Sequence, residues 1–450
     1  MDIQPILSLN AFDPAAAHDL NPAIATHVHR RSQVFGAASV LFYDEPLEFV
    51  RAEGCFLYAS DGAAYLDAYN NVPAVGHCHP AVAEAVARQL RTLNVHSRYL
   101  HPGITAYAES LLATLPPGLS NVTFTCTGSE SNDLALRLAA HATGAGGVIV
   151  TQAAYHGNTG LVSQVSPSLF LPAAPAKHVR LVPAPDSSRD PPEALARRFA
   201  DHVTAAIADL ERCGVGFSAL LVDCIFSSDG VHPHPRGFLR PAVEAVHRAR
   251  GFLIADEVQC GFGRTGESLW GFERHGVQPD VVTLGKPMGN GYPIGAVITR
   301  PEILESFIST MGYFNTFGGS PVAAAAGQAV LDVIEREGLM ENALEVGEHL
   351  LRGLADLSSQ HELIGAVRGA GLYIGVEIAG GAPAAGAAGG AAQAAKVLIN
   401  GLRDRRVLIG SAGRYGSVLK IRPPLCFSPT NADQLLGALD DVLTHLSRSR

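Results

Sequence analysis

Several features of other protein classes are missing from this 450-residue sequence. No uninterrupted apolar run is long enough to cross a bilayer, so we expect no membrane-spanning segment. Basic residues form no long block and the formal net charge is −9, so nucleic-acid binding has no electrostatic support. The seven cysteines are scattered and include no Cys-x-x-Cys pair, which argues against a disulfide framework and a zinc site. These absences argue against a membrane-spanning protein, a nucleic-acid binder and a protein held together by disulfides or zinc.

The bulk composition is that of a soluble globular protein, with 47% apolar and 17% charged residues. The chain is too long for one small core, so a large domain packed against a smaller one is expected. We expect an N-terminal arm and small sheet over 1–68, a large domain over 69–325 and a small domain over 326–450, with residues 1–68 joining the small domain. Residues 1–20 lack a basic start and an apolar core, so no signal peptide is expected and the predicted location is cytoplasmic.

The stretch 251–286 holds the strongest chemical pattern in the sequence. Its two short apolar runs end in Asp256-Glu257 and in Gly285-Lys286, as buried parallel strands do where they open into a crevice. A carboxylate and an amine at one sheet edge suit a pyridine cofactor that carries an aldehyde. Without its surroundings, such a pair is more often a solvated ion pair than part of a catalytic site.

A second pattern predicts a phosphate site. The β-rich run 122–126 is followed by Thr127-Gly128-Ser129, which opens an apolar helix. The free N–H groups and the dipole at a helix start attract an anion, although a Gly-Ser pair at this position is often a simple cap.

The segments Asp256-Glu-Val-Gln259-x-Gly-Phe-Gly-Arg-Thr-Gly266, Pro279-Asp280 and Gly285-Lys286 together resemble the lysine-site signature of class III, pyridoxal-phosphate-dependent aminotransferases. The resemblance extends from about residue 49 to about residue 428. It implies an α/β protein of the PLP-dependent transferase fold type I, with a mostly parallel seven-stranded sheet in the large domain and a smaller α+β domain. It also implies the cofactor pyridoxal 5′-phosphate (PLP).

The resemblance assigns expected roles to individual residues. Lys286 would form a Schiff base with the cofactor and act as general base, and Asp256 would hold the ring nitrogen protonated. Thr316 would reach the cofactor phosphate of a second subunit, which implies a homodimer with shared active sites or a tetramer of such dimers. The full set of implied cofactor contacts is Gly128, Ser129, Tyr155, His156, Asp223, Asp256, Val258, Gln259, Lys286 and Thr316. Tyr155 would stack on the ring, and Asp223-Cys224 departs from the family's usual Glu-Pro.

The expected substrate contacts are Asn71, Arg98, Lys420 and Arg422. Many relatives have Arg at the position of Lys420, where it grips a carboxylate, and on a strand Lys420 and Arg422 would share a face. Arg98 fits either an active-site or a dimer contact. His77 and His79 fit a loop before a helix over 81–93 better than a metal site.

Two reactions agree with these residues. We expect transfer of an amino group from an amine or amino acid to a keto acid such as pyruvate or 2-oxoglutarate. The alternative is a phospholyase that eliminates phosphate from a phosphorylated amine such as phosphoethanolamine, because segments 70–80 and 97–101 and Lys420 resemble that branch of class III. A non-catalytic scaffold is disfavoured by the intact site residues.

Overall fold

The computed structural model describes residues 5, 8–38, 40–169, 175–187, 190–379 and 390–448. A seven-stranded sheet forms its centre, in the order β4-β10-β9-β8-β7-β5-β6. Only β10 runs antiparallel to its neighbours, so the expected mostly parallel sheet is confirmed. The strands are β4 (Asn121–Thr125), β5 (Gly147–Thr151), β6 (Val179–Val182), β7 (Phe217–Val222), β8 (Phe252–Asp256), β9 (Val281–Leu284) and β10 (Gly295–Thr299).

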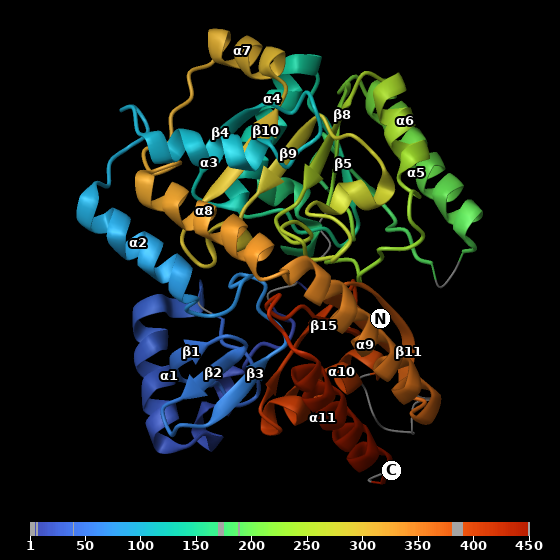
Figure 1. Ribbon diagram of the computed structural model, residues 1–450. Helices are drawn as coiled ribbons and strands as arrows, with labels where there is room; N and C mark the ends of the chain where they lie inside the picture. The colour runs from blue at the N-terminus through green and yellow to red at the C-terminus, as the bar shows by residue number, and fades with distance from the viewer. Residues whose placement is uncertain are drawn as a thin grey trace.

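Helices cover both faces of this sheet (Figure 1). Alternate strand residues enter two separate apolar clusters: Ile254 packs on the α4 face, whereas Leu253 and Ala255 pack on the opposite face with α5, α6 and α8. Burial on both faces explains why the strands are continuously apolar. The helices around the sheet are α2 (Pro80–Thr92), α3 (Pro102–Leu112), α4 (Gly128–Thr143), α5 (Pro192–Arg212), α6 (Arg240–Arg248), α7 (Pro301–Thr310) and α8 (Pro321–Arg336). Short 3₁₀ turns accompany them at Val162–Val165, Pro167–Leu169, Gly271–His275 and Lys286–Gly289.

Two four-stranded sheets lie beside the large one, in the orders β1-β2-β3-β13 and β11-β12-β15-β14. Their strands are β1 (Phe49–Glu53), β2 (Phe56–Ala59), β3 (Ala64–Asp67), β11 (Ile364–Ala370), β12 (Tyr373–Ile378), β13 (Val407–Leu408), β14 (Gly410–Ala412) and β15 (Val418–Ile421). The helices of this part are α9 (Leu339–Gln360), α10 (Gly390–Asp404) and α11 (Pro429–Arg448).

Strand β13 pairs in parallel with β3, with Val407 opposite Leu66. This pairing supports the expected union of residues 1–68 with the C-terminal part. The expected boundary at residue 325 falls inside the continuous helix α8, which packs on α2 and α3 and also on α9. The domain limits therefore stay a prediction.

The N-terminal arm contains more regular structure than its weak periodicity indicates. A 3₁₀ turn spans Pro14–Asp19, α1 spans Pro22–Phe35, and a further 3₁₀ turn spans Gly36–Ala38. Asn21 caps α1 by accepting a hydrogen bond from the Ala23 N–H, and Pro22 occupies the first turn. No residue of α1 is buried, so the helix has no apolar face for a sequence pattern to reveal.

The composition of stretch 379–395, which is almost all Gly and Ala, predicts a loop. Much of the stretch lies outside the described residues, but from Gly390 onward it is helix α10, so the prediction is wrong for that part. Within the described ranges, no helix is both long and apolar enough to cross a membrane.

Candidate active site

The carboxyl ends of the central strands converge on one cavity of about 340 Å³. Asp256 ends β8, Lys286 follows β9 by two residues, and Asp223 directly follows β7. The cavity is lined by Val72, Cys126, Thr127, Gly128, Ser129, Tyr155, His156, Gly157, Asp223, Asp256, Val258, Gln259, Lys286, Gly291, Tyr292, Pro293 and Ile294. Except for Thr316, every expected cofactor contact is in this set. Their separate roles toward a cofactor stay predictions.

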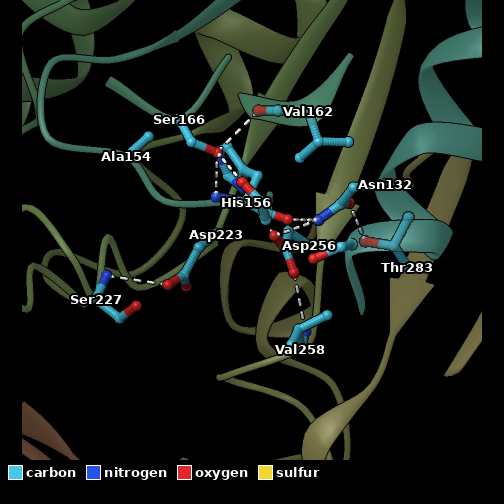
Figure 2. A network of polar contacts seen from close by, with 12 residues as sticks. Asn132, Ala154, His156, Val162, Ser166, Asp223, Ser227, Asp256, Val258 and Thr283 are labelled. Atoms are coloured by element: carbon cyan, nitrogen blue, oxygen red, sulfur yellow. Dashed lines mark hydrogen bonds and ion pairs between the residues drawn. The ribbon is translucent and has the colours of Figure 1, made fainter. Parts of the chain in front are cut away.

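Asp256 is held by three donors at the floor of this cavity (Figure 2). Asn132 Nδ2 donates to Asp256 Oδ2 at 2.9 Å, and His156 Nδ1 lies 2.7 Å from the same oxygen. The Val258 N–H donates to Oδ1 at 3.1 Å. With two contacts on Oδ2 and one on Oδ1, the carboxylate can accept one more hydrogen bond on Oδ1, in a fixed direction. A protonated ring nitrogen is a donor of this kind.

The start of α4 also lines the cavity, through Thr127, Gly128 and Ser129. A capping box closes the helix, since Thr127 Oγ1 accepts from the Glu130 N–H and the Glu130 carboxylate accepts from the Thr127 N–H. Backbones approach closely there: a Cβ on Gly128 would lie 2.9 Å from Val258 Cγ2, and a Cβ on Gly285 would lie 2.9 Å from Gly128 N. The free N–H groups at this helix end form a cradle suited to a phosphate.

Lys286 sits in left-handed backbone geometry, with φ of 36°. Burial lowers the pKa of its amine to about 8, and the positive charge of Arg422 acts in the same direction, while Asp256 and Asp223 oppose the shift. An amine with this pKa is partly neutral near pH 7–8, as a nucleophile or general base must be.

Asp223 is one methylene shorter than the family's usual Glu but still reaches the cavity. It accepts hydrogen bonds from the Ile225 and Ser227 N–H groups, both at 3.0 Å. Burial raises its pKa. Tyr155 lies between this cavity and the next, and burial together with nearby Asp256 raises the pKa of its phenol.

A second cavity of about 460 Å³ opens beside Lys286 and is bounded on the far side by the N-terminal arm. Lys420 and Arg422 both line it, so the expectation that they share a face is confirmed. Arg422 donates through NH1 to Asn71 Oδ1 at 3.1 Å and to Gln259 Oε1. Its Nε is buried without a partner, and no acidic residue is among the described lining residues. The described lining therefore contains three basic side chains, Lys286, Lys420 and Arg422, and no carboxylate.

Three predicted site residues line neither cavity. Asn71 is buried and is connected to the second cavity through its hydrogen bond with Arg422, whereas the other two lie at the surface. Thr316 is exposed. Arg98 is exposed too, with its guanidinium 3.7 Å from the centroid of the Phe314 ring. Neither lines the two cavities of this subunit, so a role for them requires a second chain.

The two neighbouring histidines act separately. His77 Nε2 lies 2.7 Å from Asp67 Oδ2, whereas His79 accepts from the Ala81 N–H and begins α2. The helix expected over 81–93 is present and lies one residue earlier, over Pro80–Thr92, with His79 as its N-cap.

Sequence reasoning missed Asn132 and Tyr373. Asn132 joins Asp256 to Thr283 by accepting from Thr283 Oγ1 at 2.7 Å. The signal was present, because Asn132 lies one helical turn after Gly128 and so on the same face of α4. Tyr373 donates to Gln259 Oε1 at 3.0 Å across a large sequence distance, which no local pattern reveals.

Comparison with known proteins places this geometry in a family. The aminotransferase class III family model matches residues 42–443. The chain is 40% identical to an alanine–glyoxylate aminotransferase 2-like protein of Drosophila melanogaster, over 93% of this chain and 87% of that protein. It is 36% identical to ethanolamine-phosphate phospho-lyase homolog 1 of Caenorhabditis elegans, over 93% of each.

Among solved structures, a phospholyase from Arthrobacter in complex with phosphoethanolamine is 42% identical, with a TM-score of 0.88 over 93% of this chain and 99% of that one. The residues of the cavity fit the family's cofactor, because the fixed Asp256 carboxylate would accept from a protonated ring nitrogen and the N–H groups at the start of α4 would bind a phosphate. The chain therefore belongs to the class III aminotransferase family, and its cofactor is pyridoxal 5′-phosphate.

Proposed function

We propose that this enzyme eliminates phosphate from a phosphorylated amine such as phosphoethanolamine. The observation that carries the proposal is the pair Lys420 and Arg422, which line the cavity beside Lys286 without an acidic side chain among its described lining. A carboxylate would balance one of these two charges, whereas a phosphate dianion would balance both.

Lys420 is the residue that favours phosphate over carboxylate. The residue is 3% exposed and forms no ion pair within the described part of the chain, and its Nζ lies 5.9 Å from the centroid of the Tyr373 ring. Burial and the charge of Arg422 lower its pKa well below 10.5. A bound dianion would stabilise the charged Lys420 ammonium and so offset the free energy lost when this group is buried away from water. As a compact charge with three donors, lysine suits phosphate oxygens better than a planar carboxylate.

The chain's own groups supply the remaining steps. PLP, when bound, provides the electron sink for the carbon next to the substrate nitrogen. The neutral Lys286 amine removes the proton from that carbon, and the electron pair left behind forms a double bond as the C–O bond to phosphate breaks. Lys420 and Arg422 neutralise the departing phosphate. Hydrolysis of the unsaturated amine then gives ammonia and an aldehyde.

Transamination is the second candidate, and one observation favours it. Arg422 has an unpartnered buried Nε, so its guanidinium can still offer a fork to the carboxylate of an amino acid or keto acid. In this case pyruvate or 2-oxoglutarate would be the acceptor.

The two reactions separate in one assay. The holoenzyme is incubated with phosphoethanolamine alone and with each keto acid, and phosphate, ammonia and amino acid are measured. We expect equal amounts of phosphate and ammonia without any keto acid. Turnover that requires a keto acid and yields an amino acid without phosphate would refute elimination.

We also propose that two copies complete each active site. Segment 96–100 packs on segment 313–317 through His96 and Phe314, whose ring centroids are 6.0 Å apart. Both segments present large apolar side chains to solvent, with Leu100 fully exposed and Phe317 74% exposed. A second copy that covers them would bring Thr316 to the partner's cofactor. We retain the cytoplasm as the proposed compartment, in agreement with the seven free cysteines.

A further inference from the structure

Arg264 is a buried cation that the proposed reaction does not use. Its residue is 2% exposed, and it has no carboxylate partner within the described ranges. Burial lowers its pKa to about 10. Burying such a charge costs desolvation free energy, so its N–H groups must find acceptors within the protein.

Those contacts are two backbone carbonyl groups of the C-terminal part. Arg264 NH1 donates to Leu372 O at 3.3 Å and to Pro423 O. The Leu372 N–H donates back to Arg264 O at 3.1 Å. Leu372 directly precedes Tyr373 and Pro423 directly follows Arg422. One guanidinium therefore fixes the two backbones that carry the hydrogen-bond partners of Gln259.

The loop that carries Arg264 is wedged between α9 and the turn before β12. A Cβ on Gly266 would lie 2.6 Å from Leu344 N, and a Cβ on Gly371 would lie 2.5 Å from the Thr265 carbonyl carbon. Both glycines have positive φ, of 75° and 52°. Such close backbone contacts leave little freedom for the loop to shift.

A single segment of chain thus touches three parts of the site. Asp256 faces the first cavity, Gln259 accepts hydrogen bonds from Arg422 and Tyr373, and Arg264 anchors the backbone that follows Arg422. We infer that Arg264 is a positioning residue that sets where Arg422 stands relative to Lys286, and so determines how tightly the substrate anion is held. This role rests on the anion site of the proposed function, but it holds for phosphate and carboxylate alike.

The test measures anion binding to the holoenzyme by calorimetry, with inorganic phosphate and pyruvate as probes. Variants Arg264→Ala and Arg264→Lys are compared with the unaltered protein. A misplacement of about 1 Å can cost about a hundredfold in reaction rate, and we expect a loss of similar order here, with the Kd of the anion rising by about tenfold to a hundredfold. PLP retention should change by less than about twofold. Added guanidinium ion should restore part of the affinity of Arg264→Ala.

Arg274 provides the matched control. It is also buried and donates to the Pro233 carbonyl at 2.8 Å, but unlike Arg264 it pairs with a carboxylate, that of Glu267. Since Glu267 directly follows Gly266, Arg274 supports the same loop, and its hydrogen bonds reach neither Arg422 nor Tyr373. Arg274→Ala should lower Tm without changing Kd, and guanidinium should not alter its Kd. If Arg264→Ala misfolds, Arg264→Lys carries the test.

Unchanged anion affinity in the Arg264 variants would overturn the inference. The inference would also be overturned if the Arg264 variants matched Arg274→Ala in Tm, PLP retention and anion Kd, and if added guanidinium ion did not restore anion binding. If the unaltered protein binds pyruvate but not phosphate, the proposal of phosphate elimination is refuted. The role of Arg264 is then still tested by the Kd of pyruvate. If the unaltered protein binds neither anion, both proposals fail.

Discussion

Lys420→Met should make the protein more stable and a poorer binder of phosphate. The buried ammonium has no ion-pair partner within the described residues, and its pKa is lowered well below 10.5. The unfolded chain therefore binds this proton more tightly, so the charge destabilises the fold at neutral pH. Methionine has similar length and no charge, and replacing buried charged groups by well-packed apolar ones can stabilise a protein by about 1–4 kcal/mol.

The sign of the pH dependence follows from the lowered pKa. Between that lowered value and 10.5 the unfolded state holds more protons, so the stability of the unaltered protein rises with pH. The advantage of Lys420→Met should thus be largest at low pH and shrink toward pH 10.5. Thermal unfolding of anion-free holoenzyme between pH 6 and 10 measures it, with exposed Lys177→Met as the control.

Binding should change in the opposite direction. Removing one of two cations that face a bound dianion is expected to cost about 2 kcal/mol, roughly 30-fold in the Kd of phosphoethanolamine. Lys420→Arg keeps the charge, so its affinity for phosphoethanolamine should fall by a smaller factor than that of Lys420→Met. A Met variant that is less stable than its parent and binds phosphoethanolamine unchanged would refute the reasoning.

Further predictions concern the cofactor and the subunit contact. Lys286→Ala should lower turnover by at least about 10²–10⁴-fold, measured as product release. In the apoenzyme, capture of PLP should accelerate as pH rises through about 8, where the Lys286 amine becomes neutral; Arg422→Met should move this midpoint upward, because the Arg422 charge lowers the pKa. Asn132→Ala removes a donor to Asp256 and should weaken PLP retention in dialysis, whereas unchanged retention would contradict the network. Thr316→Ala should weaken PLP retention as well, and unchanged retention would count against a cross-subunit phosphate contact.

The sequence revealed those parts of the fold and site that depend on local pattern. Continuous apolar runs that end in polar groups predicted β8 and β9 and the meeting of Asp256 with Lys286, because parallel strands end at one edge. The Gly-Ser turn before an apolar helix predicted the start of α4. Period-2 spacing placed Lys420 and Arg422 on one face.

Contacts between distant segments could not be predicted in this way. Tyr373 meets Gln259 from 114 positions away, and Arg264 meets Pro423 from 159 positions away, so no periodicity connects them. Helix α1 was missed for a different reason, since it buries no residue and shows no apolar stripe. Thr316 is exposed in the single chain, whereas the contact expected for it is with the cofactor of a second chain.

The most direct test counts phosphate released per active site when excess phosphoethanolamine is the only substrate. If Lys420 and Arg422 hold a leaving phosphate beside Lys286, release continues for many turnovers without a keto acid. Release that never exceeds the background of Lys286→Ala, together with amino-group transfer that stops after one equivalent per site until pyruvate is added, would contradict the account.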